Sequence, residues 1–116
     1  QALDRSLEQR RGIRRYGSAS VPMDEALADV SLDYSGRAYL VFSGELKSAM
    51  IGDFESDLLR AFLEAMATSA RMTLHIRFYG ENDHHKAESI FKALGLAGRQ
   101  AAMMEGTAVP STKGLI

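Results

Sequence analysis

Apolar and polar positions alternate along several stretches of the chain, which is the pattern of half-buried β-strands. Ala26 to Tyr34 alternates most cleanly, and Met72 to Phe78 follows the same pattern; Ala38 to Leu46 is a further predicted strand. A further strand at Ser18 to Pro22 is interrupted, because Pro22 cannot donate to a ladder and marks an edge or a strand end. Ser35 and Gly36 separate two of these strands, so we expect Ala26–Tyr34 and Ala38–Leu46 to form an antiparallel hairpin.

Two other stretches carry apolar residues at helical spacing. After an irregular connection that ends at Gly52, Ser56 can cap a helix that reaches about Ala70. The predicted buried stripe of this helix is Leu58, Leu59, Phe62, Leu63 and Met66. The second helix begins after Gly80, with Asn82 or Asp83 as its cap, and buries Ala87, Ile90, Phe91 and Leu94.

The predicted order is strand, strand, strand, helix, strand, helix. This β-β-β-α-β-α order indicates an α+β domain in two layers, with one mixed sheet covered on a single face by two helices. No predicted helix remains for the other face of the sheet, so we expect that face to be uncovered.

The second helix carries candidate metal ligands in the run YGENDHHKAESIFKAL, from Tyr79 to Leu94. Neutral imidazole and carboxylate together suit borderline divalent ions such as zinc, manganese or iron. His84 and Glu88 are four residues apart and share a helix face, whereas His85 points about a quarter-turn away, so the two histidines are predicted to serve different ions. The alternative interpretation is that both histidines are solvated polar residues near a helix start.

Composition narrows the class of protein. The chain has 116 residues, of which 46% are hydrophobic and 25% charged, as in an ordinary soluble single domain. A formal net charge of −1 provides no general attraction to nucleic acid or to an anionic membrane, so neither is an expected partner. There is no cysteine, which excludes disulfides and thiolate metal sites. No long apolar run and no signal-peptide pattern is present, and we expect a cytoplasmic protein.

The two ends of the sequence differ from its centre. Gln1 to Glu8 has the spacing of the tail of a helix, and Gly12 is its predicted stop. The basic cluster of the chain, Arg10, Arg11, Arg14 and Arg15, follows this tail; it can be a solvated helix end, but Arg15 should lie in a strand entering the sheet. Gly106 to Ile116 is rich in turn residues and cannot continue the last helix.

Five runs, in this order, resemble the second half of the imidazoleglycerol-phosphate dehydratase family: GIRRYGSASVPMDEAL, DYSGRAYLVF, IGDFESDLL, MTLHIRFYGENDHHKAESIFKAL and VPSTKG. The resemblance covers nearly the whole chain. It implies a hydro-lyase of histidine biosynthesis that dehydrates D-erythro-imidazoleglycerol phosphate to imidazole-acetol phosphate. It also implies two manganese ions in each active site, shared between subunits of a cage-like homo-oligomer of twenty-four subunits.

The resemblance further implies that residues 1–116 are one domain, half of a duplicated fold that also occurs in a ribosomal protein. Residues 1–11 would then be the tail of the preceding half's last helix, and residues 105–116 a tail ordered over the substrate phosphate. Carried over by motif, the metal ligands are His84, His85 and Glu88. The implied substrate-binding residues are Arg15, Arg37, Lys92, Ser111 and Lys113.

The sequence departs from the family pattern in two respects. The family's first half, which carries its own histidine pair and the catalytic carboxylate, lies outside this sequence, so no catalytic residue is assigned here. Ala61 stands where the family commonly has a histidine ligand, and a methyl group cannot coordinate a metal. His75, on a predicted strand, is interpreted as a structural histidine rather than as a replacement ligand.

Two other classes of function stay open at the level of sequence. The chain can be a noncatalytic half-domain that binds a partner half through the uncovered face and acts only in assembly. It can also be a nucleic-acid binder that uses the arginine cluster, although the acidic balance of the chain argues against this.

Overall fold

The computed structural model describes residues 12–104. The predictions for the helix tail at residues 1–11 and for the phosphate tail at residues 105–116 lie outside this range. The elements in chain order are β1 (Tyr16–Met23), β2 (Ala26–Asp33), β3 (Tyr39–Ser43), β4 (Met50–Ile51), β5 (Phe54–Glu55), α2 (Ser56–Ala70), β6 (Thr73–Tyr79) and α3 (Asp83–Ala102).

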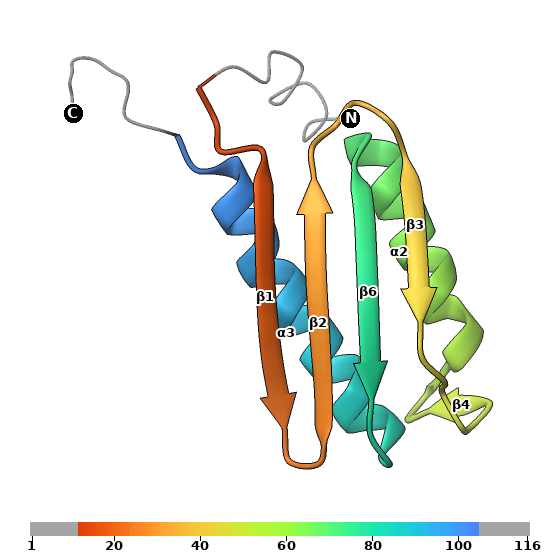
Figure 1. Ribbon diagram of the computed structural model, residues 1–116. Coiled ribbons are helices and arrows are strands. Elements are labelled where there is room, and N and C mark those ends of the chain that lie inside the picture. Colours follow the sequence, from red (N-terminus) through yellow and green to blue (C-terminus); the bar gives the residue numbers. More distant parts are fainter. Residues whose placement is uncertain (1–11, 105–116) are drawn as a thin grey trace.

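The described residues form the two layers that the sequence predicts. Figure 1 shows β1, β2, β6 and β3 side by side, in that order, with α2 and α3 behind the same face of the sheet. The sheet is mixed, since β1, β2 and β6 pair antiparallel and β3 pairs parallel with β6. α3 packs behind β1 and β2, and α2 packs behind β3. The α+β prediction is therefore confirmed.

The predicted hairpin between Ala26–Tyr34 and Ala38–Leu46 is wrong. β6 lies between β2 and β3, and the hairpin of the sheet is instead formed by β1 and β2 through the tight turn at Asp24 and Glu25. β3, α2 and β6 form a βαβ unit, in which a helix connects two parallel strands. Ser35 and Gly36 thus begin a connection to the far edge of the sheet rather than a hairpin turn.

The core lies between the sheet and the two helices. The central strands supply the deeply buried side chains of Val30, Leu74 and Ile76, and the helices supply those of Leu63 and Ile90. Gly17 permits the close packing of α3 on β1, since a Cβ atom there would lie 1.9 Å from the carbonyl oxygen of Ala97. A larger residue at this position would therefore push β1 away from α3.

The buried stripe of α2 differs from the prediction. Leu59 and Leu63 are buried as expected, but Leu58 and Phe62 are 54% and 50% exposed. The buried side of the helix is completed by Ala67 and Ala70. On α3, Phe91 is likewise 41% exposed instead of buried. The outer side of the helix layer therefore presents apolar side chains to solvent.

The other face of the sheet is uncovered by the described residues, as predicted, and it is largely polar. Side chains that point to this face include Ser18, Ser31, Ser43, His75 and Arg77. His75 is thus an exposed histidine on a strand face. Between residues 12 and 104, no helix is both long enough and apolar enough to cross a membrane.

Candidate metal and phosphate sites

The histidine pair lies in the first turn of α3, where the sequence places it. Asn82 is the N-cap residue of the helix, and its side-chain oxygen accepts a hydrogen bond from the backbone N–H of His85 at 3.0 Å. Gly80, with φ of 148°, turns the chain from β6 into this cap. The start of α3 therefore lies at the end of the sheet at which β6 finishes (Figure 1).

His84 and Glu88 form the first candidate ligand pair. The Nε2 atom of His84 lies 3.6 Å from Oε1 of Glu88, and the two side chains are 71% and 38% exposed. Two donors that each bind one ion at about 2.1 Å stand about 3.0 to 3.5 Å apart, so a small side-chain rotation brings this pair to metal-binding geometry. The shared face predicted for these residues is confirmed.

His85 points to a different group of residues. Its Nδ1 atom lies 2.9 Å from Oε1 of Glu25, and its Nε2 atom lies 3.7 Å from Oδ2 of Asp24. The hydrogen bond to Glu25 raises the pKa of His85 above its ordinary value, more than desolvation lowers it. The sequence prediction that the two imidazoles diverge is therefore correct.

Glu25 is a site residue that the sequence analysis missed. One of its oxygens accepts the backbone N–H groups of Asn82 at 2.7 Å and Glu81 at 2.8 Å, and the other contacts His85. The N–H of Asn82, the imidazole of His85 and the N–H of Glu81 lower the pKa of Glu25 to about 2, so this carboxylate is ionised at neutral pH. Its position in the turn after a strand gave no signal in the sequence, because the pairing of β2 with β6, which places this turn beside the start of α3, was not predicted.

An apolar pocket of about 440 Å³ adjoins His84 and Glu88. Ile51 and Phe54, from the β4–β5 hairpin, and Phe91 of α3 supply its apolar walls. Lys92 also lines the pocket, and its Nζ atom lies 3.3 Å from Oε2 of Glu88. The structure thus brings the predicted substrate-site lysine next to the predicted metal ligands.

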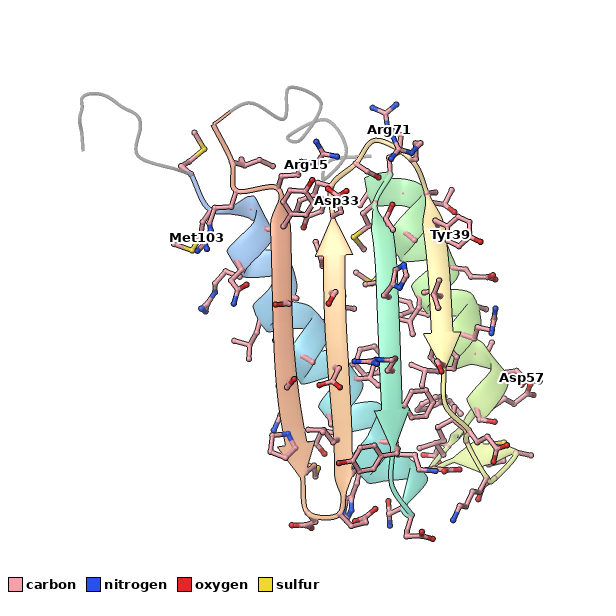
Figure 2. All side chains as sticks on the ribbon, in the orientation of Figure 1. Arg15, Asp33, Tyr39, Asp57, Arg71 and Met103 are labelled. Carbon is pink, nitrogen blue, oxygen red and sulfur yellow. The ribbon has the colours of Figure 1, made fainter. Side chains whose placement is uncertain are left out.

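Arg15 lies at the opposite end of the sheet. It immediately precedes β1, with φ of 76°, rather than lying within the strand as predicted. Its guanidinium donates to the carboxylate of Asp33 from Nε at 2.6 Å and from Nη2 at 3.3 Å, and this contact raises the pKa of Arg15. Figure 2 shows Arg15, Asp33 and Arg71 at the same end of the molecule.

Arg37 is exposed in the connection between β2 and β3. This connection lies at the end of the sheet at which β1 begins (Figure 1). Its backbone is held by Ser35, whose hydroxyl accepts the Arg37 N–H at 3.1 Å. Ser111 and Lys113, the other two predicted phosphate residues, lie outside the described range.

The metal-type residues at the start of α3 are therefore far from Arg15 and Arg37 within one copy of the chain. Leu27 pairs with Tyr79 near the histidine end, and Asp33 pairs with Thr73 near the arginine end. Six residue steps of about 3.3 Å each separate these two pairs, or roughly 20 Å. Within residues 12–104, a single copy cannot bring the histidine pair and these two arginines to one small ligand.

The ligand set for a metal is also incomplete in one copy. Within residues 12–104, no three side chains of the His, Asp and Glu types gather around a common metal position. Ala61, at the position where the family commonly has a histidine, is exposed on α2. The imidazole and carboxylate types fit a borderline divalent ion, but further ligands have to come from outside the described residues.

The fold and these residues define an α+β domain with a histidine–carboxylate cluster at one end of its sheet and arginines at the other. A sequence model of the family "Imidazoleglycerol-phosphate dehydratase" matches residues 1–97. The chain belongs to this family.

Individual relatives agree with the family match. The chain is 50% identical over 117 residues to an imidazoleglycerol-phosphate dehydratase from Bacillus cereus, with 98% of this chain and 60% of the relative covered. It is 49% identical over 105 residues to the protein of that name from Methanosarcina barkeri, covering 90% of this chain and 55% of the relative. The chain thus spans less than two thirds of the length of these relatives.

Solved structures show the same fold. The crystal structure of imidazoleglycerol-phosphate dehydratase from Staphylococcus aureus superposes with a TM-score of 0.85 at 38% identity, covering 89% of this chain and 61% of that one. A structure of the Pyrococcus furiosus protein has a TM-score of 0.77 at 40% identity, covering 99% of this chain and 64% of that one.

Proposed function

We propose that this chain supplies the second half of an imidazoleglycerol-phosphate dehydratase, a hydro-lyase of histidine biosynthesis. The reaction removes water from D-erythro-imidazoleglycerol phosphate to give imidazole-acetol phosphate. The observation that carries the proposal is the divergence of two adjacent imidazoles at the start of α3. His84 faces Glu88 and His85 faces Glu25, so one helix turn offers ligands to two separate ions.

The bound metal is proposed to be manganese, held by His84, His85 and Glu88 together with ligands from another half or another copy. Metal ions in such a site stabilise the negative charge that develops when a carbon-bound proton is removed. Residues of this chain orient the ligand side chains. Glu88 shares a helix face with His84, and Glu25 contacts the Nδ1 atom of His85.

The substrate phosphate is proposed to bind at the arginine end. Two guanidiniums, from Arg15 and Arg37, make charge-assisted hydrogen bonds to a dianion, with Ser111 and Lys113 completing the set. The carboxylate of Asp33 accepts a hydrogen bond from Nε of Arg15, and this contact orients the guanidinium.

An imidazole ring joined by three carbons to a phosphate is too short to bridge the distance of roughly 20 Å between the two ends of the sheet. The active site therefore combines the helix start of one copy with the arginine end of another, in a homo-oligomer. Lys92, beside Glu88, contacts the substrate from the metal side.

The experiment that tests this proposal mixes the chain with a chain supplying the family's first half and follows product formation with and without Mn²⁺. Activity that depends on both the first half and Mn²⁺ is the expected result. Arg37→Ala should raise KM about tenfold to a hundredfold, since each contact to a charged group contributes about 1.5 to 3 kcal/mol. Glu88→Gln should instead lower turnover and recover partly in excess Mn²⁺.

Arg77→Ala provides the matched control for the arginine variant. Arg77 is exposed on the open sheet face and lies 3.8 Å from Asp29, away from both sets of site residues, so its KM should match the wild type. Identical metal dependence and unchanged KM in Arg37→Ala and Glu88→Gln would contradict the proposed division of roles.

Assembly without catalysis is the second candidate function, and the helix layer favours it. Leu58 and Phe62 share an exposed face of α2, and the ring of Phe62 packs 5.8 Å from that of Phe91. A partner half is therefore expected against the helices rather than against the polar, uncovered face of the sheet. A stable complex with the first half that shows no activity at any Mn²⁺ concentration would favour this candidate.

A further inference from the structure

Glu25 connects two turns that are far apart in the sequence. It lies in the β1–β2 turn, and its Oε2 atom accepts the N–H groups of Glu81 and Asn82 just before α3. The two turns are in close contact, because a Cβ atom on Gly80 would lie 2.8 Å from the Cα atom of Ala26. Backbone groups thus hold the carboxylate in place independently of its contact with His85.

The second oxygen of Glu25, Oε1, determines which ring nitrogen of His85 carries the proton. An ionised carboxylate can only accept hydrogen bonds, so at 2.9 Å the Nδ1 atom of His85 has to carry the proton. The Nε2 atom of a neutral ring then keeps its lone pair. Asp24 is the nearest acidic group on that side, but at 3.7 Å from Nε2 it is too distant for a hydrogen bond that would place a proton there.

We propose that Glu25 is a positioning residue that holds His85 as the Nδ1–H tautomer and directs its Nε2 lone pair outward for a metal ion. This inference rests on the proposed function for the metal, but the tautomer itself does not depend on a metal being bound. Carboxylate partners of this kind orient ligand histidines and increase their basicity.

The same geometry predicts the effect of Glu25→Gln. The amide oxygen can replace Oε2 as the acceptor for the N–H groups of Glu81 and Asn82. The amide NH₂ group then faces Nδ1 of His85 and donates to it, so the ring proton has to move to Nε2. The substitution therefore preserves the link between the turns while reversing the tautomer and blocking the metal-binding nitrogen.

The test is NMR of the imidazole nitrogens in the metal-free full chain at pH 9, with the His85 signals assigned by comparison with His85→Ala. We expect the Nδ1–H tautomer in the wild type and the Nε2–H tautomer in Glu25→Gln. Glu81→Gln is the matched control, because it removes the same charge from the adjacent segment while its side chain contacts Lys47 rather than His85. The His85 tautomer in Glu81→Gln should match that in the wild type.

Mn²⁺ affinity of the chain mixed with a chain that supplies the family's first half, measured by the EPR signal of the free ion, is the second readout. Glu25→Gln should weaken binding about tenfold to a hundredfold, and Glu81→Gln should change it less than twofold. An Nε2–H tautomer in the wild type, or an unchanged tautomer and affinity in Glu25→Gln, would overturn the inference. If the tautomers are as expected but the wild type binds no Mn²⁺, the positioning role stands and the proposed metal function fails.

Discussion

Asp83 and Lys86 face each other in the first turn of α3, with Oδ1 and Nζ 3.1 Å apart and both side chains buried. Burial by itself would raise the pKa of Asp83. The N–H groups of Lys47 and Ser48 and the ammonium of Lys86 outweigh it, so the pKa lies below its ordinary value. Lys86 also donates to the carbonyl oxygen of Glu45 at 2.8 Å. The pair therefore attaches the segment after β3 to the helix that carries the histidines.

Replacement of Lys86 by Met should strongly destabilise the chain, because it leaves the Asp83 carboxylate buried without its cation. Loss of one partner of a buried pair costs about 3 to 5 kcal/mol, measurable by urea unfolding. Lys47→Met is the control, since it breaks only the exposed pair with Glu81 and should cost about 0 to 1 kcal/mol. Equal effects of the two substitutions would show that the buried pair contributes no more than a surface contact.

Arg71 ends α2 in the left-handed conformation, with φ of 52° and ψ of 56°. Glycine adopts this conformation without the steric cost of about 1 to 2 kcal/mol that a Cβ atom brings. Arg71→Gly should therefore raise the free energy of unfolding relative to Arg71→Ala by about 1 kcal/mol. The comparison with alanine separates the backbone effect from any contact of the arginine side chain. Thermal unfolding that ranks alanine above glycine would contradict this explanation.

The isolated chain should self-associate through the helix layer. Exposed Phe62 and Phe91 are in contact there, and contiguous apolar surface of this kind favours association. Sedimentation at micromolar concentration should show species above the 12.7 kDa monomer. The double substitution Phe62→Ser with Phe91→Ser should reduce their mass. Tyr39→Ser, which removes a 65% exposed ring from the edge strand β3, should leave it unchanged. A folded wild-type monomer at all concentrations would refute this prediction.

The chain alone should bind Mn²⁺ only weakly. Its candidate ligands face two directions, and within residues 12–104 they do not form a group of three. Calorimetry should show weak binding that is lost when His84 and His85 are both replaced by alanine. Tight stoichiometric binding that survives this double substitution would show that the metal is held elsewhere.

Ala61→His should strengthen Mn²⁺ binding when the partner half is supplied, if the exposed side of α2 faces the shared site. Ala65→His, one helical turn further along the exposed side of α2, is the positional control and should have no effect. Unchanged affinity in Ala61→His would show that position 61 does not face the metal.

Much of the candidate site could be predicted from local sequence, because helical periodicity alone determines that His84 and Glu88 share a face and that His85 diverges. The cap of α3 was predicted for the same reason, since Asn82 acts on a backbone N–H only three residues away. Glu25 could not be predicted. Its partners are more than 50 residues distant, and only the pairing of β2 with β6 places it beside the start of α3.

The sequence by itself determined the four strands of the main sheet, the two helices and their order, because the spacing of apolar residues depends only on the geometry of each element. It did not predict β4 and β5, which lie in the expected irregular connection. It did not determine which strands are neighbours. The alternation of apolar and polar side chains is compatible with β3 pairing directly with β2 and also with β6 lying between them. In the structure, the βαβ connection through α2 places β6 between β2 and β3. Only the tertiary structure showed that the arginines and the histidines lie at opposite ends of the sheet. That separation follows from strand direction, since β2 carries the chain away from the histidine end before Arg37 is reached.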